Sequence, residues 1–450
     1  MASVQIPNNR FVSFAKDTLS SVNSKHLPIT YHKYDRRFLS NAKEKIKMKN
    51  NQQFKKLLLS VFGLICIGFS IVFLNSIVLA QRNNFTINTS VTSFSEQGFP
   101  FLFNPAVKPA NNITVHVFAS GLNAPRGLKF GSDDNLYVAE AGLGGNVSTM
   151  GECQQVPAPV GPWLGGNTAR ILRFNPDGLV STVAENLPSA QAAIGDRIGI
   201  ADIAFLNGRL YALLAGGGCS HGHSEIPNSV LQINSDGTWN PIADISSFVM
   251  HNETANPEPE DFEPDGMPYN MVAARGALYV TESNHGQLLR VRTNGNIRRV
   301  IDISALQGPS VPTPTALTFN RNFYVGNLGT FPLVAGSSKI LKVKPNGNFT
   351  TAAVGLTAVL GVAFDENDNL YVLETTTNNP FPTPGTGRVV RVRNDGTLEE
   401  IVTGLNFPTA MTFGPDGKLY ISNWGFGPPV PGLGEILQIT LPRHLDVSDN

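Results

Sequence analysis

The sequence predicts an all-β protein whose main domain, residues 113–441, is a six-bladed β-propeller with four strands in each blade. Two observations carry this prediction: a tyrosine-centred hairpin recurs six times, and a second hairpin alternates with it. The composition agrees. The 450 residues include 43 glycines and 31 prolines and only 15% are charged, which favours many short strands and turns over helices.

The first repeated unit is an apolar strand, a short turn of Asp, Asn or Gly, and a strand centred on tyrosine. GLKFGSDDNLYVAE and MTFGPDGKLYISN are its first and last copies. The six tyrosines are Tyr137, Tyr211, Tyr279, Tyr324, Tyr371 and Tyr420. The last four are 45 to 49 residues apart, which fits one four-stranded blade in each interval.

The second unit is a hairpin whose turn contains Asp-Gly or Asn-Gly, a strong signal between alternating apolar residues. Its five turns lie at Gly178, Gly237, Gly295, Gly347 and Gly396. A sixth copy, ILQITL at 436–441, has no following strand before the chain ends. TVHVFASGL at Thr114–Leu122 can supply that strand. The amino-terminal strand is therefore expected to complete the last blade, closing the ring and hiding its sheet edges.

The connections between strands divide into two kinds. Turns between strands one and two, and between three and four, are tight and share one face of the ring. Most insertions fall in the connections of the other face, which we call the long-loop face: 141–169, 216–228, 246–268, 330–338, 375–387 and 424–434. Long loops gathered on a rigid scaffold commonly carry binding, so we expect function on this face.

A polar residue stands three positions after five of the six tyrosines: Glu140, Glu282, Asn327, Glu374 and Asn423. Strand alternation and topology place these residues as a ring at the mouth of the central channel. One interpretation is a binding ring with Glu140, Glu282 and Glu374 as candidate Ca²⁺ ligands. The other is that each side chain ties down a neighbouring loop through backbone amides. The second is favoured, because a repeat reproduces structural residues.

Loop 246–268 is rich in carboxylates, and four of them are candidates for an acidic binding loop: Glu258, Glu260, Asp261 and Asp265. Their spacing fits no EF-hand, so we expect a solvated acidic loop. Cys219, His221 and His223 lack a second group at zinc-site spacing. No nucleophile–base pair is evident, and no residue is assigned as catalytic.

Residues 57–80 form an uncharged, mostly apolar run that follows a segment, 1–56, with 12 basic and 3 acidic residues. The run is either a transmembrane anchor with 1–56 in the cytoplasm, or a signal peptide that starts at Met48 and is cleaved after Ala80. Either way, the linker 81–112, the propeller and the tail 442–450 are expected to be periplasmic or secreted.

Two further features bear on the compartment and on partners. Cys153 and Cys219 are the only cysteines after the apolar run, and we expect them to form a disulfide in an oxidising space. Residues 81–450 carry 22 basic and 31 acidic residues, which argues against binding to nucleic acid. We expect a monomer.

The stretch from Val117 to the carboxyl end resembles the ScyD/ScyE family of exported proteins. GLNAPRGLKFGSDDNLYVAEAGLGG, PTALTFNRNFYVGNLGTFP and GLNFPTAMTFGPDGKLYISNWGFG carry the resemblance. The tyrosine hairpins are also similar to NHL repeats, in which an acidic residue commonly ends the second strand, as Glu140, Glu282 and Glu374 do. The resemblance implies an exported propeller and supports the loop-tying role of these residues.

Three functions remain open at this stage. The first is a noncatalytic propeller that binds a protein partner or a small ligand through the long-loop face, with no cofactor assigned. The second is a Ca²⁺-dependent hydrolase or lactonase, which requires the ring residues to converge on one cation with a position left for water. The third is a purely structural envelope protein. The first is favoured, because the insertions gather on one face.

Overall fold

The computed structural model describes residues 107–257, 262–306, 313–378, 380–427 and 430–442. The expected cytoplasmic segment 1–56, the expected anchor or signal helix 57–80, most of the expected linker and residues 443–450 lie outside the described residues. Within the described ranges, no helix is both long enough and apolar enough to cross a membrane.

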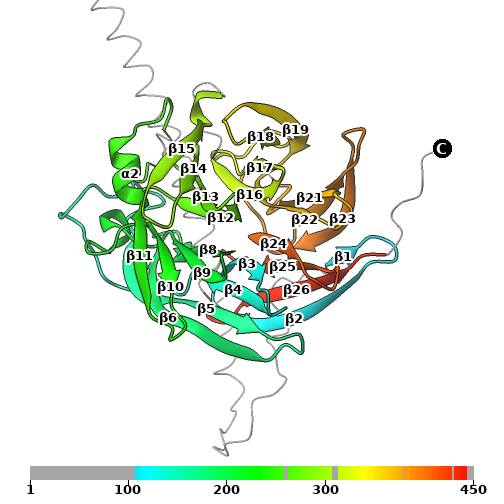
Figure 1. Cartoon of the computed structure of the whole chain (residues 1–450), viewed down its shortest axis with the longest axis horizontal. Coiled ribbons are helices and arrows are strands. Elements are labelled where there is room, and N and C mark those ends of the chain that lie inside the picture. The colour runs from blue at the N-terminus through cyan, green and yellow to red at the C-terminus, as the bar shows by residue number, and fades with distance from the viewer. Residues whose placement is uncertain (1–106, 258–261, 307–312, 379, 428–429, 443–450) are drawn as a thin grey trace, which may run out of the picture. The chain divides into compact units, whose positions relative to one another are not determined.

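Six antiparallel sheets are arranged around a central axis, as predicted (Figure 1). The inner strands, which contact one another around the ring, are β3 (Pro125–Phe130), β8 (Ile200–Leu206), β12 (Pro268–Ala274), β16 (Pro314–Asn320), β20 (Val359–Phe364) and β24 (Ala410–Phe413). The second strands are β4 (Leu136–Glu140), β9 (Arg209–Leu214), β13 (Ala277–Glu282), β17 (Asn322–Asn327), β21 (Leu370–Glu374) and β25 (Leu419–Asn423).

The outer half of each blade is a second hairpin. Its third strands are β5 (Leu164–Phe174), β10 (Ser229–Ile233), β14 (Gln287–Val291), β18 (Ser338–Val343), β22 (Gly387–Val392) and β26 (Gly434–Thr440). The outermost strands are β6 (Val180–Gln191), β11 (Trp239–Asp244), β15 (Ile297–Asp302), β19 (Phe349–Leu356), β23 (Leu398–Leu405) and β2 (Thr114–Leu122). Each tight Asp-Gly or Asn-Gly turn joins the third strand to the outermost one.

The last blade is closed by the amino-terminal strand, which confirms the prediction. β2 pairs antiparallel with β26, in a register that runs from Thr114 opposite Thr440 to Leu122 opposite Gly434. Phe118 of β2 packs edge-on against Tyr420, with ring centroids 5.3 Å apart. The two ends of the propeller sequence therefore share one sheet.

The repeated tyrosine packs one blade against the next. Tyr137 lies edge-on against Phe205 of the following inner strand, with ring centroids 5.0 Å apart. Three more pairs repeat this contact at 4.8 to 5.1 Å: Tyr324 with Phe364, Tyr371 with Phe413, and Tyr420 with Phe130. Edge-to-face aromatic pairs add to the burial of apolar surface. The shared Phe and Tyr of the repeat are therefore explained by packing between blades.

Several elements were not expected from the sequence. A short helix, α2 (Ile245–His251), begins loop 246–268, and the Asp244 side chain caps it by accepting from the Ser247 N–H. Strand β5 begins at Leu164, inside the expected loop 141–169, and β7 (Arg197–Ile198) extends the first blade. In the expected linker, β1 (Lys108–Pro109) pairs with β23.

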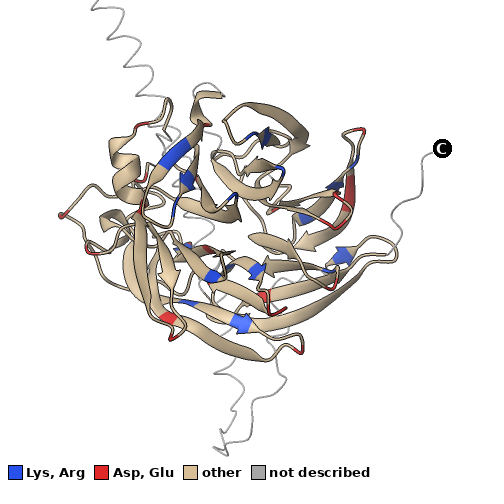
Figure 2. Ribbon diagram, viewed as in Figure 1, with Lys and Arg blue, Asp and Glu red and all other residues tan. Residues whose placement is uncertain are grey.

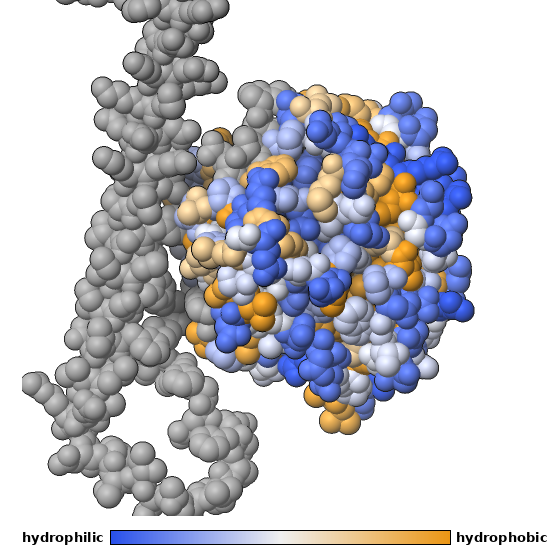
Figure 3. Space-filling view, turned by 90° about the vertical axis from the view of Figure 1, so that its left-hand side faces the viewer, coloured by the Kyte–Doolittle hydropathy of each residue, from blue (hydrophilic) through white to orange (hydrophobic). Residues whose placement is uncertain are grey.

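The surface is mixed in character. Figure 2 shows charged residues spread over the blades, with several acidic residues at the ends of hairpins. On the side of the ring that carries α2 and β11, apolar residues form small groups among hydrophilic ones (Figure 3). A cavity with mainly apolar walls, described below, lies among the long loops.

Candidate functional site

A disulfide links two long loops of neighbouring blades. Cys153 lies in the β4–β5 connection, and Cys219 begins a short 3-10 helix, η1 (Cys219–His221), in the β9–β10 connection. Their Cα atoms are 6.3 Å apart. The expected pairing is thus present in the structure. The Thr149 hydroxyl also donates to the Cys219 carbonyl, so the two loops are joined by a covalent bond and a hydrogen bond.

The end of loop 246–268 is buried, which corrects the expectation of a solvated acidic loop for Glu263 and Asp265, whereas Glu253 is exposed as expected. Asp265 Oδ2 accepts from the Ser220 N–H at 2.8 Å and from the Ser220 hydroxyl at 2.7 Å. The Asn228 amide donates to the Gly266 carbonyl at 2.8 Å. Asp265 therefore holds η1 against this loop. Glu258, Glu260 and Asp261 lie outside the described residues.

Glu263 and His221 form a buried pair. Their spacing in the sequence did not predict this contact. His221 Nε2 lies 3.3 Å from Glu263 Oε2, and both side chains are at most 2% exposed. Trp163 packs edge-on against the imidazole, and His221 Nδ1 lies 2.6 Å from the Gly217 carbonyl oxygen. Burial opposes protonation of the imidazole, but the Glu263 carboxylate outweighs it and raises the pKa of His221. Burial raises the pKa of Glu263.

A second acid–histidine pair lies in the next blade. His285 Nδ1 is 3.3 Å from Glu282 Oε1, and both side chains are largely buried. Burial lowers the pKa of His285, but the charge of Glu282 outweighs it, and the net pKa is raised. For Glu282, burial is outweighed by His285 and by N–H donors, so its pKa is lowered. Both shifts favour the charged forms, so the pair is an ion pair at mildly acidic pH.

A cavity of about 700 Å³ lies among the disulfide, α2 and loop 246–268. Its apolar lining includes Val249, Met250, Ala255, Pro257, Phe262 and Pro264. Its polar lining is Gln154, Glu253, Thr254, Asp265 and His285. The Thr254 hydroxyl is buried and has no hydrogen-bond partner among the described residues. This volume and this lining are typical of a small-molecule site.

The predicted ring residues lie at the ends of the second strands and tie down neighbouring loops. Glu140 accepts from the Asn123 N–H at 2.7 Å and pairs with Arg170 on β5. Glu374 accepts from the Thr357 N–H at 2.6 Å and pairs with Arg388 on β22. These contacts are those expected of the loop-tying interpretation.

The remaining ring residues behave similarly. Glu282 accepts from the Met267 N–H at 3.0 Å, besides its contact with His285. Asn327 accepts from the Lys339 N–H at 2.9 Å, and Asn423 from the Asn406 N–H at 2.8 Å. In the described part of the chain, no three His, Cys, Asp or Glu residues form a group that could hold a metal ion. Glu140, Glu282 and Glu374 are thus not brought together as a Ca²⁺ site.

The sequence patterns did not predict the two histidine pairs or the cavity, although His221 and Glu282 were named individually. Glu263 and His221 are 42 positions apart in different connections. No periodicity relates two such loops. The one available signal was the density of Cys, His and acidic residues in 216–228 and 246–268.

Comparisons with known proteins find structural neighbours of low sequence identity. No family model matches the chain, and no curated protein matches it. A gluconolactonase from Xanthomonas campestris is 13% identical with a TM-score of 0.45, over 74% of this chain and 91% of that one. A putative oxidoreductase (glucose dehydrogenase) from Thermus thermophilus is 17% identical with a TM-score of 0.45, over 73% and 100%. A streptogramin B lyase is 14% identical with a TM-score of 0.41, over 73% of this chain and 98% of that one. Similarity this low gives no basis for transferring an activity.

Proposed function

We propose that the protein is a noncatalytic, extracytoplasmic propeller that binds a small, mainly apolar ligand in the cavity between the disulfide, α2 and loop 246–268. The observation that carries the proposal is the cavity itself: about 700 Å³, with apolar walls and a few polar groups. The ligand is expected to carry a hydrogen-bonding group for the Thr254 hydroxyl, which is buried without a partner in the described structure.

Two further observations support the proposal. The disulfide between Cys153 and Cys219 suits an oxidising compartment, in agreement with the expected export and with the resemblance to the ScyD/ScyE family. The walls of the cavity are fixed by a covalent bond and by the buried contacts of Asp265 with Ser220. A wall held in this way loses little conformational entropy when a ligand binds.

The alternative of a Ca²⁺-dependent hydrolase is less favoured by the contacts of the ring. Glu140 and Glu374 already pair with arginines, and Glu282 pairs with His285. A cation would have to displace these partners from buried carboxylates, which costs several kcal/mol for each broken pair. The noncatalytic function is therefore the one we propose.

The test is titration of the full-length protein with a neutral apolar dye, N-phenyl-1-naphthylamine, followed by fluorescence. We expect saturable binding at one site. Met250→Asp, which places a charge on an exposed part of the cavity wall, should weaken it at least tenfold. The matched control is Leu179→Asp, which makes the same kind of change at an exposed apolar residue in the β5–β6 turn, on the opposite face.

Either of two results would overturn the proposal. One is a wild-type protein that shows no saturable dye binding. The other is an equal loss of binding in both variants, which would assign the dye to general surface or unfolding effects. Melting curves of both variants establish that they are folded before binding is compared.

A further inference from the structure

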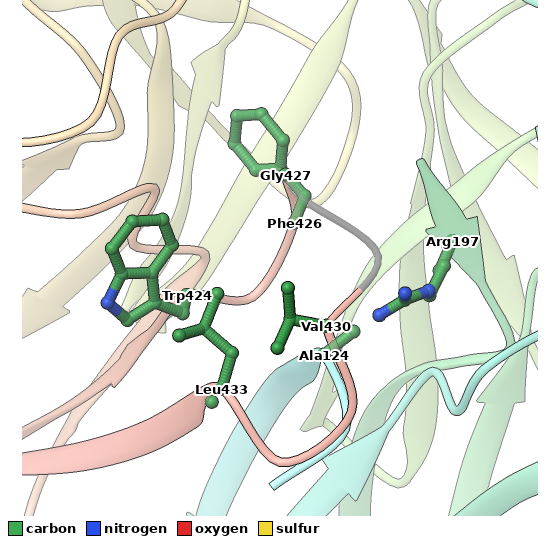
Figure 4. Close-up of a pocket in the computed structure, with 8 residues that line it drawn as sticks. Ala124, Arg197, Trp424, Phe426, Gly427, Val430 and Leu433 are labelled. Atoms are coloured by element: carbon green, nitrogen blue, oxygen red, sulfur yellow. The ribbon is translucent and has the colours of Figure 1, made fainter. Parts of the chain in front are cut away.

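A second site lies at the mouth of the central channel, apart from the cavity of the proposed function. Arg197 of β7 lies opposite loop 424–434 of the last blade, and its guanidinium points toward Ala124 and Val430 (Figure 4). The residue is only 6% exposed. Its Nε is buried without a hydrogen-bond partner among the described residues.

The carboxylate of the neighbouring Asp196 acts on this arginine together with a second one, Arg126. Asp196 Oδ1 accepts from the backbone N–H of Arg197 at 2.7 Å and from Arg126 at 3.2 Å. Arg126 is itself 6% exposed and also donates to the Arg197 carbonyl. Of the two buried guanidinium groups, that of Arg126 is hydrogen-bonded to Asp196, whereas that of Arg197 meets the carboxylate only through its charge, so one positive charge is left over. An unpaired buried charge is costly, so the site favours an anion.

The size and the lining of the cavity beside Arg197 indicate which kind of anion fits it. The small cavity beside Arg197 has a volume of about 10 Å³, which is room for one water-sized group. Its other walls are mainly apolar: Ala124, Trp424, Phe426, Val430 and Leu433. Trp424 and Phe426 are half-buried and Val430 is exposed, so an apolar chain can lie over them outside the cavity.

Trp424 also adopts an uncommon backbone conformation. Its φ is 57°, in the left-handed backbone region that residues other than Gly, Asn and Asp rarely adopt. Its N–H donates to the Asn406 carbonyl at 2.7 Å, and its ring packs edge-on against Phe407. The indole is therefore held in place at the channel mouth. Strained residues of this kind occur often at ligand sites.

We propose that Arg197 binds the carboxylate of a small monocarboxylic acid with an apolar tail, and that the tail lies against Trp424, Phe426 and Val430. Arginine is suited to this role because its cationic N–H groups form charge-assisted hydrogen bonds to a carboxylate, one oxygen of which can occupy the small cavity. Arg126 strengthens the positive potential but is already hydrogen-bonded, so Arg197 makes the direct contact.

The probe is hexanoate, titrated into the full-length protein by calorimetry and followed in parallel by tryptophan fluorescence. We expect one saturable site with a change in the emission of Trp424. Hexanamide, which has the same tail and no charge, should bind at least tenfold more weakly. Acetate should bind more weakly than hexanoate, because it lacks the tail.

Arg197→Gln should weaken hexanoate binding at least tenfold, while Arg321→Gln leaves it unchanged. Arg321 is the matched control because it is an exposed arginine in the β16–β17 turn, on the opposite face. A second variant, Trp424→Asn, keeps a residue that tolerates the positive φ and removes the indole. It should weaken hexanoate but not acetate.

The ligand-free Arg197→Gln protein should melt no lower than the wild type, because an uncompensated buried cation has been removed. Absence of saturable hexanoate binding to the wild type would overturn the proposal. So would equal affinity of the wild type and Arg197→Gln, or equal affinity for hexanoate and hexanamide. None of these results depends on the dye site near α2.

Discussion

Glu140, Glu282 and Glu374 are wholly buried, and each has its counter-charge within its own blade. Two of the partners are arginines on the third strand, and the third is His285, which follows β13. Only the histidine titrates near neutral pH. The same carboxylate position therefore faces an arginine in two blades and a titratable histidine in the third.

We predict that His285→Gln lowers the free energy of unfolding by about 1.5–3 kcal/mol at mildly acidic pH and by less at alkaline pH. The pKa of His285 is raised in the folded protein, so its contribution is complete below its unfolded value of about 6.5 and is lost as the pH rises through the folded value. The pKa of Glu282 is lowered in the folded protein, so its share is complete above its unfolded value and is lost as the pH falls through the folded value.

Urea unfolding of the wild type and the variant at pH 5.5, 7 and 8.5 measures this difference. The titratable neighbours Glu263, His221 and His223 are present in both proteins, so their contributions to the pH dependence largely cancel. His251→Gln, on the exposed surface of α2, serves as the control. A difference that is constant over this pH range would contradict the prediction.

At the scale of the element, the last residue of the second strand anchors the segment that leads into its own blade in four of the six blades. The anchoring N–H comes 17 positions earlier in three blades: Asn123 to Glu140, Thr357 to Glu374, and Asn406 to Asn423. The constant offset follows from a hairpin of fixed length. Because this anchor needs only one acceptor oxygen, Glu and Asn can replace one another at this position.

We predict that Glu374→Gln destabilises the protein less than Glu374→Ala does. The glutamine side chain keeps an acceptor oxygen for the Thr357 N–H, just as Asn423 accepts from the Asn406 N–H in the last blade. Alanine removes the acceptor of both the Thr357 N–H and the Arg388 guanidinium. Breaking a buried pair costs about 3–5 kcal/mol, which is the loss expected for alanine. Urea unfolding gives the comparison.

Running the same unfolding series in Ca²⁺ and in chelator separates loop-tying from metal binding. We expect the order of the three proteins to be the same in both solutions. A stabilisation of the wild type by Ca²⁺ that both variants lose would instead assign Glu374 to a cation site.

At the scale of the whole molecule, the repeat determines the ring, and the loops determine the site. The Tyr hairpins, the Asp-Gly turns and the closure by Thr114–Leu122 were predictable, because each is a local pattern repeated in every blade. The disulfide followed from a count of cysteines. The His221–Glu263 pair, the cavity and the unpartnered Arg197 were not predictable, because they depend on how unrelated connections pack on one face.

Closure by β2 gives the last prediction. Deletion of residues 1–122 removes the outer strand of the last blade, exposing the edge of β26 and removing Phe118 from its contacts with Tyr420 and Phe174. We expect the free energy of unfolding to fall by more than about 3 kcal/mol, the lower end of the cost of removing one large core side chain. An exposed edge also favours association through added strands. Deletion of residues 1–112 is the control, because β1 is the one strand that it removes from the described part of the chain. Light scattering and thermal unfolding compare the two proteins, and a synthetic TVHVFASGL peptide should restore part of the lost stability of the shorter one. Equal melting temperatures, with both proteins monomeric, would show that the ring does not depend on its amino-terminal strand.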